Sequence, residues 1–424
     1  MYDGREHYDE RERIQCAIDK NILSKWVSSE YSLGLQPIVH TELLAHYTSL
    51  ASFYDIVKTD GFWATQARFS NDDEELEYAA ELFSLDINDI PDVYVVSLCR
   101  HEDLLSQWRG YTQESEGVSM SFDFSTWQQA HLKYDEKRNS ETFYVLPHQV
   151  LYLSKSNLSF SWTRFVEDYK NDTLLSIMRH RFVSLIKHPS FSEENEYRLS
   201  VINVLGQFDS FVRYRTSESV RIPFVELRIG IPEIDVDKTP CVIRINIDAS
   251  RLEMIKERIQ ELIDNNLFEN EVVFCRDGKS NTPYDDRQCY GCTMRTYPEG
   301  TRSDIKSQSE KSHAKPCCYG GQPCYISTEA DVIMISQGAK QKEVFTQMAD
   351  IADKINCTSE KNAQPLKVWC EGHLPIRKIR VGNTRRKKEL KEAIAHFCRY
   401  SEFFWLRYVD VEATETPFRA KLKF

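Results

Sequence analysis

The sequence lacks any uninterrupted run of about 18 apolar residues, which is the length that a membrane-spanning helix needs. Residues 1–7 are mostly polar or charged, so they offer no apolar core of a signal peptide. These two absences predict a cytoplasmic protein that has no membrane partner.

Three common catalytic signatures are also missing, namely a glycine-rich phosphate loop, a dinucleotide-binding fingerprint and a Gly-x-Ser-x-Gly elbow. Their absence excludes the commonest kinases, dehydrogenases and hydrolases. Positive charge is in deficit, since 54 Lys and Arg residues face 65 Asp and Glu residues and give a net charge of -11. This balance argues against a general attraction to nucleic acid phosphates, although it leaves room for a local basic groove.

Cysteine, in contrast, is plentiful, with 12 in 424 residues. In a long chain without a signal peptide, these cysteines are expected to be reduced thiols or metal ligands. Cys289 and Cys292 form a Cys-x-x-Cys pair, and Cys317 and Cys324 follow after a polar stretch. Two interpretations stay open: a structural zinc ion held by these four thiolates, or free thiols in a flexible insertion.

Short apolar runs bounded by turn residues predict many strands and few helices over residues 43–227. Residues 93–99 have the composition of a buried strand, and residues 117–124 alternate as a half-buried strand does. Hairpin-like strands outnumber strand-helix-strand units, so we expect an α+β fold. Two later strand-helix-strand patterns, at residues 242–284 and 376–419, predict a C-terminal α/β extension.

An acidic cluster runs directly into a predicted buried strand at residues 193–202. Because strand side chains alternate, we expect Glu194 and Glu196 to lie on one face. Repulsion between two carboxylates, together with desolvation, raises the pKa of one of them and prepares the pair for proton or cation chemistry. The alternative is a solvated strand entry in which Arg198 neutralises its neighbours.

Other polar and aromatic residues are candidates for a binding site. His46, on a predicted strand, is either a donor to a ligand hydroxyl or a satisfied core histidine, and Thr48 shares its face. Trp108 and Tyr111, three apart on a short predicted helix, either wall a pocket for a planar ring or belong to the core. Asn71 precedes a helix start, where capping explains it better than cation binding does.

The order and spacing of these motifs resemble a large bacterial family with HYT, NDPxE, WxxY, ExEYR and TPFR-like segments. The resemblance covers about residues 40–290, with a second match at residues 416–419. One departure is Asp73, which stands where the family usually has proline. That family is similar to the ADP-ribosyltransferase fold, so the resemblance implies a split β-sandwich with flanking helices, to which a Cys-rich insertion is added here.

The resemblance also implies that NAD is the substrate. Cleavage of the bond between nicotinamide and ribose passes through an oxocarbenium-like cation, which a carboxylate beside the 2'-hydroxyl stabilises as the charge develops. By resemblance Glu196 is that carboxylate, His46 holds the ribose hydroxyl, and Glu194 orients or deprotonates the acceptor. The further residues assigned to NAD binding are Tyr47, Thr48, Ser49, Trp108, Tyr111, Asn71 and Arg198.

Four regions are predicted: an N-terminal helical segment at residues 1–40, a catalytic domain at 41–288, a Cys-rich insertion at 289–326 and a C-terminal α/β region at 327–424. The predicted function is transfer of ADP-ribose from NAD to a macromolecular acceptor, either protein or nucleic acid. By resemblance the chain is a bacterial toxin or antiviral defence effector, with an antitoxin or regulatory protein as a further partner. Two alternatives are an NAD glycohydrolase, which uses water as the acceptor, and a catalytically inactive ligand-sensing module.

Overall fold

The computed structural model describes the chain in segments between residues 43 and 416. The described residues are 43–69, 74–90, 92–112, 117–124, 130–132, 141–143, 147–156, 183–203, 206, 208–217, 220–229, 240–246, 254–255, 257–258, 272–274, 294–296, 332–337, 341–359, 363–370 and 373–416. The predicted N-terminal segment lies outside them. The same holds for Asn71 and for the four predicted zinc ligands Cys289, Cys292, Cys317 and Cys324.

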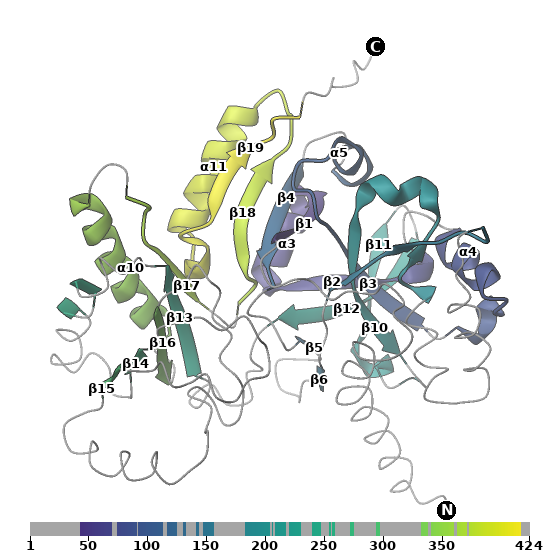
Figure 1. Cartoon of the computed structure of the whole chain (residues 1–424), viewed down its shortest axis with the longest axis horizontal. Coiled ribbons are helices and arrows are strands. Elements are labelled where there is room, and N and C mark those ends of the chain that lie inside the picture. The colour runs from purple at the N-terminus through teal and green to yellow at the C-terminus, as the bar shows by residue number, and fades with distance from the viewer. Residues whose placement is uncertain are drawn as a thin grey trace, which may run out of the picture.

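The described chain mixes helices and strands, and a mostly antiparallel open sheet of 12 strands dominates it (Figure 1). The main path through this sheet runs β19 (Asp410–Ala413), β18 (Ile376–Val381), β4 (Gly117–Asp123), β1 (Leu43–Ser49), β3 (Asp92–Cys99), β2 (Gly61–Gln66), β12 (Val220–Ile229), β5 (Ala130–Leu132) and β6 (Glu141–Phe143). Three strands join off this path: β7 (His148–Gln149), β10 (Glu196–Asn203) and β11 (Val212–Ser217). The α+β class predicted from the sequence is confirmed.

The helices are few and mostly short. They are α3 (Leu50–Thr59), α4 (Glu75–Leu82), α5 (Leu105–Tyr111), α10 (Gln341–Thr358) and α11 (Lys387–Tyr400), with 3-10 turns η2 (Ala67–Phe69), η3 (Ile87–Asp89), η4 (Pro189–Glu194), η6 (Asp209–Phe211) and η8 (Phe404–Leu406). None of these helices is both long and apolar enough to cross a membrane.

The large sheet forks at β3. Along one edge, β3 pairs with β10 over its whole length. Along its other edge, β3 pairs with β2 at Tyr94 and Val95 and with β1 at Cys99. The two neighbours therefore diverge from a shared strand: β1 continues to β4, β18 and β19, and β2 continues to β12. We call the stretch of β3 between Val95 and Cys99, where β1 and β2 separate, the fork.

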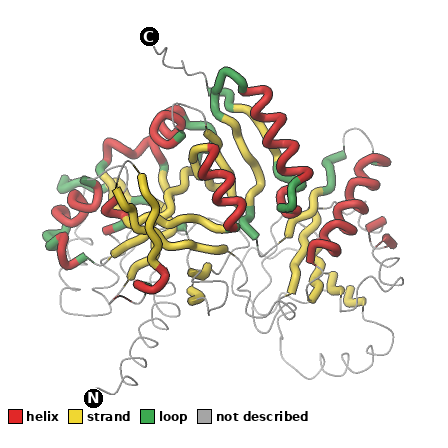
Figure 2. The backbone as a smooth tube through the Cα atoms, turned by 180° about the vertical axis from the view of Figure 1, so that it is seen from behind, coloured by secondary structure: helices red, strands yellow, loops and turns green. Residues whose placement is uncertain are grey.

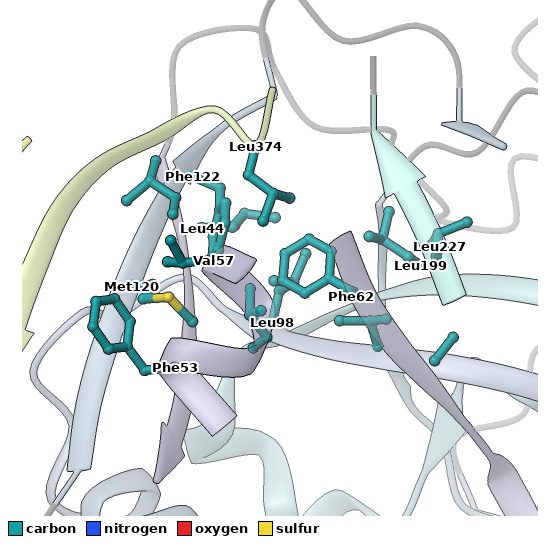
Figure 3. Packing of buried hydrophobic residues seen from close by; sticks show 14 of the residues in the cluster. Leu44, Phe53, Val57, Phe62, Leu98, Met120, Phe122, Leu199, Leu227 and Leu374 are labelled. Carbon is teal, nitrogen blue, oxygen red and sulfur yellow. The ribbon is translucent and has the colours of Figure 1, made fainter. Parts of the chain in front are cut away.

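One face of the sheet forms the main hydrophobic core. Helix α3 lies against this face (Figure 2), and its buried residues are Phe53, Ile56 and Val57, which share one side of the helix. Figure 3 shows the packing of large apolar side chains from both arms of the fork. Those labelled from the strands are Leu44, Phe62, Leu98, Met120, Phe122, Leu199 and Leu227. Each such side chain, when fully buried, stabilises the fold by about 1.5–3 kcal/mol relative to leaving it exposed. This face of the sheet therefore serves to stabilise the fold.

The C-terminal part divides between two sheets. A small sheet of β16 (Val332–Gln337), β13 (Pro240–Asn246) and β17 (Lys367–Cys370) packs with α10 around its own core. After β17 the chain joins the large sheet, where β18 pairs with β4 and with β19. Two further strand pairs are β14 (Val272–Phe274) with β15 (Met294–Thr296) and β8 (Leu151–Tyr152) with β9 (Ile186–Lys187).

Candidate functional site

The acidic stretch turns sharply where it enters β10. Glu194 ends η4, and Asn195 adopts a left-handed conformation with φ 46° before Glu196 begins the strand. Asparagine tolerates this conformation better than most residues. Glu196 lies opposite Cys99 of β3, and Arg198 lies opposite Ser97. All four residues alternate with core residues such as Leu98 and Tyr197, so they occupy the second face of the sheet.

Arg198 is the centre of a buried ion network on this second face. Its Nε lies 2.7 Å from Glu196 Oε1 and its Nη2 lies 2.9 Å from Glu196 Oε2, which is a two-point contact. Its Nη1 pairs with Glu75 of α4 and donates to the carbonyl oxygen of Ser184 at 2.7 Å. Such bidentate, charge-assisted contacts are the strong class of hydrogen bond, and they fix the orientation of the Glu196 carboxylate.

Lys187 of β9 supplies the second cation. Its Nζ lies 2.7 Å from Glu194, 3.3 Å from Glu75 and 3.4 Å from Glu196. The side chain of Glu194 is 14% exposed, while the other members of the network are between 4% and 7% exposed. The network therefore holds three carboxylates against two cations, and Glu194 is its most accessible member.

The environment shifts the pKa values of Glu194 and Glu196, the two carboxylates of the ExE pair, in opposite directions. Burial alone would raise the pKa of Glu196, but Arg198 and Lys187 outweigh burial and hold that pKa below its usual range. Burial raises the pKa of Glu194 in spite of its contact with Lys187. The sequence predicted a raised pKa for one carboxylate, and the structure assigns it to Glu194. Such a split between neighbouring titratable groups is typical of acid and base pairs in active sites.

The sequence analysis did not assign Glu75 or Lys187 to this site. Glu75 belongs to an acidic run that the start of a helix accounts for, and Lys187 follows Ile186 at the end of an apolar run. A lysine that continues a buried strand was the available signal, because such a charge requires partners.

Tyr111, Tyr152 and Cys99 adjoin the network. Burial raises the pKa of Tyr111 to about 12, and the negative charge of Glu196 adds to this, so the phenol stays protonated. The Tyr152 hydroxyl accepts a hydrogen bond from the Glu196 backbone N–H at 2.9 Å. Burial also raises the pKa of Cys99 to about 12, and its thiol donates to the carbonyl oxygen of Glu194 at 3.0 Å. Cys99 is therefore a poor nucleophile, because the thiolate is the reactive form.

His46 is not in direct contact with Glu196. Because strand side chains alternate, His46 lies on the core side of β1. Its ring contacts the Phe62 ring edge-on, with 5.6 Å between the ring centroids. Its Nδ1 lies 2.9 Å from the carbonyl oxygen of Ser97 in the fork. Burial lowers the pKa of His46, so it is neutral and Nδ1 is the donor. Ser97 links the two candidates, because its side chain hydrogen-bonds Glu196.

Trp108 does not form a wall that is open to a ligand, contrary to one of the two interpretations of the sequence. It is fully buried, its ring meets Tyr47 edge-on at 5.0 Å, and its Nε1 donates to Asp103 Oδ1 at 2.7 Å. The Tyr47 hydroxyl donates to the carbonyl oxygen of His101 and accepts from the N–H of Leu104. Both aromatic residues thus fasten residues 101–112 to the sheet.

The carboxylate of Asp103 also binds the C-terminal segment. Oδ1 accepts from the hydroxyl of Thr414, and Oδ2 accepts from the N–H of Glu415 at 2.9 Å. The Thr416 hydroxyl donates to the backbone carbonyl of Asp103 at 2.9 Å. We call this set of contacts the Asp103 clasp.

The remaining predicted residues of β1 have structural partners. Ser49 caps α3, with its hydroxyl oxygen accepting from the N–H of Ser52 at 3.2 Å. Thr48 is buried opposite Val118 of β4. Of the predicted site residues, Glu194, Glu196, Arg198 and Tyr111 therefore come together, whereas His46 approaches them only through Ser97.

Comparisons with known proteins gave one match, to a domain family of unknown function. Comparison with curated proteins and with solved structures gave no match. Residues 107–199 match a family model described as protein of unknown function (DUF2971), in a segment that begins beside Trp108 and ends just after Arg198. A DUF2971 domain, from a family whose function is unknown, is thus found at the residues that build most of the network.

Proposed function

We propose that the chain cleaves the bond between nicotinamide and ribose in NAD and transfers ADP-ribose to a macromolecular acceptor. The observation that carries this proposal is the unequal environment of the ExE pair. Glu196 is a fixed anion held by Arg198 and Lys187, and Glu194 is a more accessible carboxylate whose pKa is raised. The fixed negative charge of Glu196 suits the stabilisation of a developing cation, and the raised pKa of Glu194 suits proton transfer.

Glu196 stabilises the transition state in this mechanism. The bond from ribose C1' to the nicotinamide nitrogen breaks, and the electron pair leaves with nicotinamide. Positive charge then develops on the ribose, where a preoriented carboxylate stabilises it without reorganising. Because Arg198 contacts both oxygens of Glu196, it is a positioning residue that keeps the carboxylate ionised and fixed.

Glu194 receives the proton of the acceptor. As the acceptor nucleophile bonds to ribose C1', its proton passes to a carboxylate of Glu194. A raised pKa brings a carboxylate closer to the working pH and makes it a better base. Tyr111 packs on the cluster that contains Cys99 and Trp108, and the charge of Glu196 adds to its raised pKa, so Tyr111 is the proposed stacking surface in place of the buried Trp108.

The fork in the large sheet also supports this proposal. Two arms that separate at β3 are the arrangement expected of a split β-sandwich of the ADP-ribosyltransferase kind. The role of a bacterial toxin or antiviral effector, and the choice between protein and nucleic acid as acceptor, rest on the family resemblance alone.

A second candidate is a ligand-sensing module without turnover. One observation favours it: the oxygens of Glu196 are engaged by Arg198 and Lys187, and the residue is only 5% exposed. In a sensor, such a network stabilises one conformation and takes no part in chemistry.

Incubation with NAD labelled in the adenosine part separates these functions. Label on a macromolecule supports transfer, free ADP-ribose supports hydrolysis, and unchanged NAD supports a sensor. Glu196→Gln keeps the shape of the side chain and removes its charge, so we expect about a hundredfold or greater loss of NAD consumption. Full activity in this variant would refute the assigned role of Glu196.

Glu412→Gln is the matched control. Glu412 also pairs with an arginine, Arg380, but at the opposite end of the large sheet. We expect this variant to consume NAD at close to the wild-type rate.

A further inference from the structure

Positive charge gathers where β18 leads into α11. Residues 385–392 contain five Lys and Arg residues and two Glu residues, so this stretch carries a net charge of +3 in a chain whose net charge is -11. Four of these cations are exposed, namely Arg385, Arg386, Lys388 and Lys391. We call these four side chains the basic cluster. It is a local basic surface of the kind that the overall charge leaves room for.

The basic cluster differs from the cations that precede it in the chain. Lys378 and Arg380 of β18 both pair with Glu102, at 3.0 and 2.7 Å. Lys387, which begins α11, donates through Nζ to the carbonyl oxygen of Thr414 at 3.1 Å. Within the residues that the structure describes, by contrast, no carboxylate forms an ion pair with any member of the basic cluster. The neighbouring cations therefore hold the fold together, and the basic cluster does not.

The position of the basic cluster disfavours the helix that carries it. The N-terminal end of a helix bears partial positive charge, so cations in and beside its first turn are destabilising. Lys391 also lies three residues from Lys388 and four from Lys387, and like charges at such spacings on a helix repel each other. Helix stability therefore does not account for the basic cluster, whereas an external polyanion would relieve the repulsion.

Contacts tie the start of α11 to the segment that carries α5. The N–H of Gly382 donates to the carbonyl oxygen of Gly117 at 2.9 Å. Gly117 in turn lies against Thr112, because a Cβ placed on Gly117 would meet the Thr112 Cβ at 2.6 Å. Thr112 directly follows Tyr111, the last residue of α5. The basic cluster and Tyr111, the proposed stacking surface, therefore lie at the same end of the large sheet (Figure 1).

The register of the strands gives the separation between the basic cluster and the candidate site. Val381, at the end of β18, lies in register with Thr48 of β1 through β4. Ala45, three residues earlier on β1, lies in register with Glu196 of β10 through β3. Four strand spacings of about 4.8 Å and three residues of about 3.3 Å place Val381 and Glu196 roughly 20 Å apart. A small ligand cannot span this distance, but roughly six nucleotides of a strand, at about 3.4 Å each, can.

Single-stranded nucleic acid fits these requirements. Its phosphates supply a row of anions, which arginine contacts at two oxygens and lysine as a point charge. Helix α11 packs on the core face of the sheet, and the candidate site lies on the second face. A bound chain must therefore pass around the end of the sheet, which a flexible single strand can do.

An anionic membrane fits the basic cluster less well. Surface-bound helices bury apolar side chains in the membrane as well as pairing their cations with lipid headgroups. Among the described residues of α11, the exposed large apolar side chain is Tyr400, at the opposite end of the helix. The basic cluster therefore offers charge without an apolar anchor.

We propose that the basic cluster binds the phosphate backbone of a single-stranded nucleic acid. This binding does not depend on the proposed function. Where the chain transfers ADP-ribose, the bound strand is the macromolecular acceptor, and this second step rests on the proposed function. The basic cluster then holds the strand while a nucleotide several positions away reaches Glu194.

Binding of the full chain to a fluorescent single strand of about 20 nucleotides, as DNA and as RNA, is measured by anisotropy at several sodium chloride concentrations. The cluster variant combines Arg385→Gln, Arg386→Gln, Lys388→Gln and Lys391→Gln. We expect it to bind at least about tenfold more weakly than the wild type. The slope of log affinity against log salt should become shallower by about 3, because each phosphate contact to a single strand contributes about 0.7.

The matched control removes four exposed cations from other parts of the surface, by combining Lys58→Gln, Arg221→Gln, Lys342→Gln and Lys354→Gln. Each variant lowers the net charge by four units, so a difference between them reflects the position of the cations and not the total charge. We expect the control to keep most of the wild-type affinity.

Equal affinity in the cluster variant and the control, or no binding of either strand by the wild type at low salt, would overturn the proposal. Binding to phosphatidylserine vesicles without binding to either strand would also overturn it, in favour of a membrane surface. If the cluster variant fails to fold by circular dichroism, Arg385→Gln with Arg386→Gln changes residues that precede α11 and should still weaken binding severalfold. Unchanged affinity there would count against the proposal.

Labelled NAD added to the same mixtures tests the acceptor step separately. Label on the bound strand supports its role as the acceptor. Label on protein alone would overturn that role and leave the binding result standing. If NAD is not consumed, the proposed function fails, and anisotropy still decides whether the basic cluster binds the strand.

Discussion

Two ion networks in this molecule contain the same charges but differ in burial. Each joins one arginine and one lysine to three carboxylates. The network of Arg198 contains Lys187, Glu75, Glu194 and Glu196, and the network of Arg380 contains Lys378, Glu102, Asp103 and Glu412. The carboxylates of the first network are 6% to 14% exposed, whereas those of the second are 17% to 44% exposed.

This difference in burial separates the chemistry of the two networks. Around Arg380, the cations and hydrogen bonds outweigh burial and lower the pKa values of Glu102 and Asp103, so both carboxylates are stable anions. Around Arg198, Glu196 is held ionised while the pKa of Glu194 is raised. The same set of charges therefore ties strands together at one site and, in the proposed mechanism, prepares a proton-transfer pair at the other.

The largest contrast is expected when each central arginine is replaced. Arg198→Met leaves buried carboxylates without their cation and should lower the free energy of unfolding by about 3–5 kcal/mol. Arg380→Met affects groups that water still reaches, so a loss of about 1 kcal/mol is expected. Urea unfolding of both variants measures the difference. Equal losses would mean that burial does not separate the two networks.

Next in size is the contrast in activity. Glu196→Gln should reduce NAD consumption about a hundredfold or more, whereas Glu102→Gln should leave most of the activity. Both variants replace a carboxylate that contacts an arginine. Comparable losses in the two would place the chemistry outside the Arg198 network.

A smaller contrast is expected in how the stability of the fold depends on pH. The sign of this dependence is opposite in the two networks. The folded-state pKa of Glu194 is raised, so its ionisation destabilises the fold as pH rises above the usual glutamate range. The folded-state pKa of Glu102 is lowered, so its contribution is present above the usual glutamate range and is lost as pH falls below that range toward the lowered pKa. Relative to wild type, the stability of Glu194→Gln should therefore rise from about pH 4.5 to about pH 7, whereas the deficit of Glu102→Gln should shrink as pH falls below about 4.5. Thermal unfolding across both pH intervals tests the signs.

The smallest predicted difference is the response to salt. At about 0.1 M ionic strength, exposed charges are screened over roughly 10 Å, while buried pairs are screened much less. The destabilisation caused by Arg380→Met should shrink when sodium chloride is added, and that caused by Arg198→Met should not. Parallel salt dependence in the two variants would contradict the burial argument.

Local pattern was enough to predict much of the fold. Alternation and apolar runs located β1, β3 and β4, because these strands bury apolar side chains and the sequence shows where those side chains recur. The strand-helix-strand pattern at residues 376–419 is present, but residues 404–406 form the turn η8 and the second strand, β19, begins only at Asp410. Aromatic contacts explain the difference: Phe404 and Trp405 both pack on His373, with Trp405 stacked on it at 4.0 Å.

The candidate site was less predictable because its partners come from distant segments. The ExE pair and Arg198 are adjacent in sequence, so strand alternation alone placed Glu196 and Arg198 on one face. Glu75 of α4 reaches Arg198 only through the tertiary fold, and nothing local indicates that contact. His46 illustrates the limit differently, since the pattern placed it on a strand but could not show that the fork, through Ser97, separates it from Glu196.

The Asp103 clasp has a consequence for how the protein is made. Asp103 and Thr414 are 311 positions apart, and ribosomes add residues at about 5–20 per second. Roughly 15–60 s therefore pass between synthesis of the two halves of the clasp. Until Thr414 emerges, Asp103 lacks its C-terminal partners, and the segment that carries Trp108 and Tyr111 is fastened at fewer points. A nascent chain thus completes this part of the candidate site only after residues 414–416 have emerged, long after Asp103 itself.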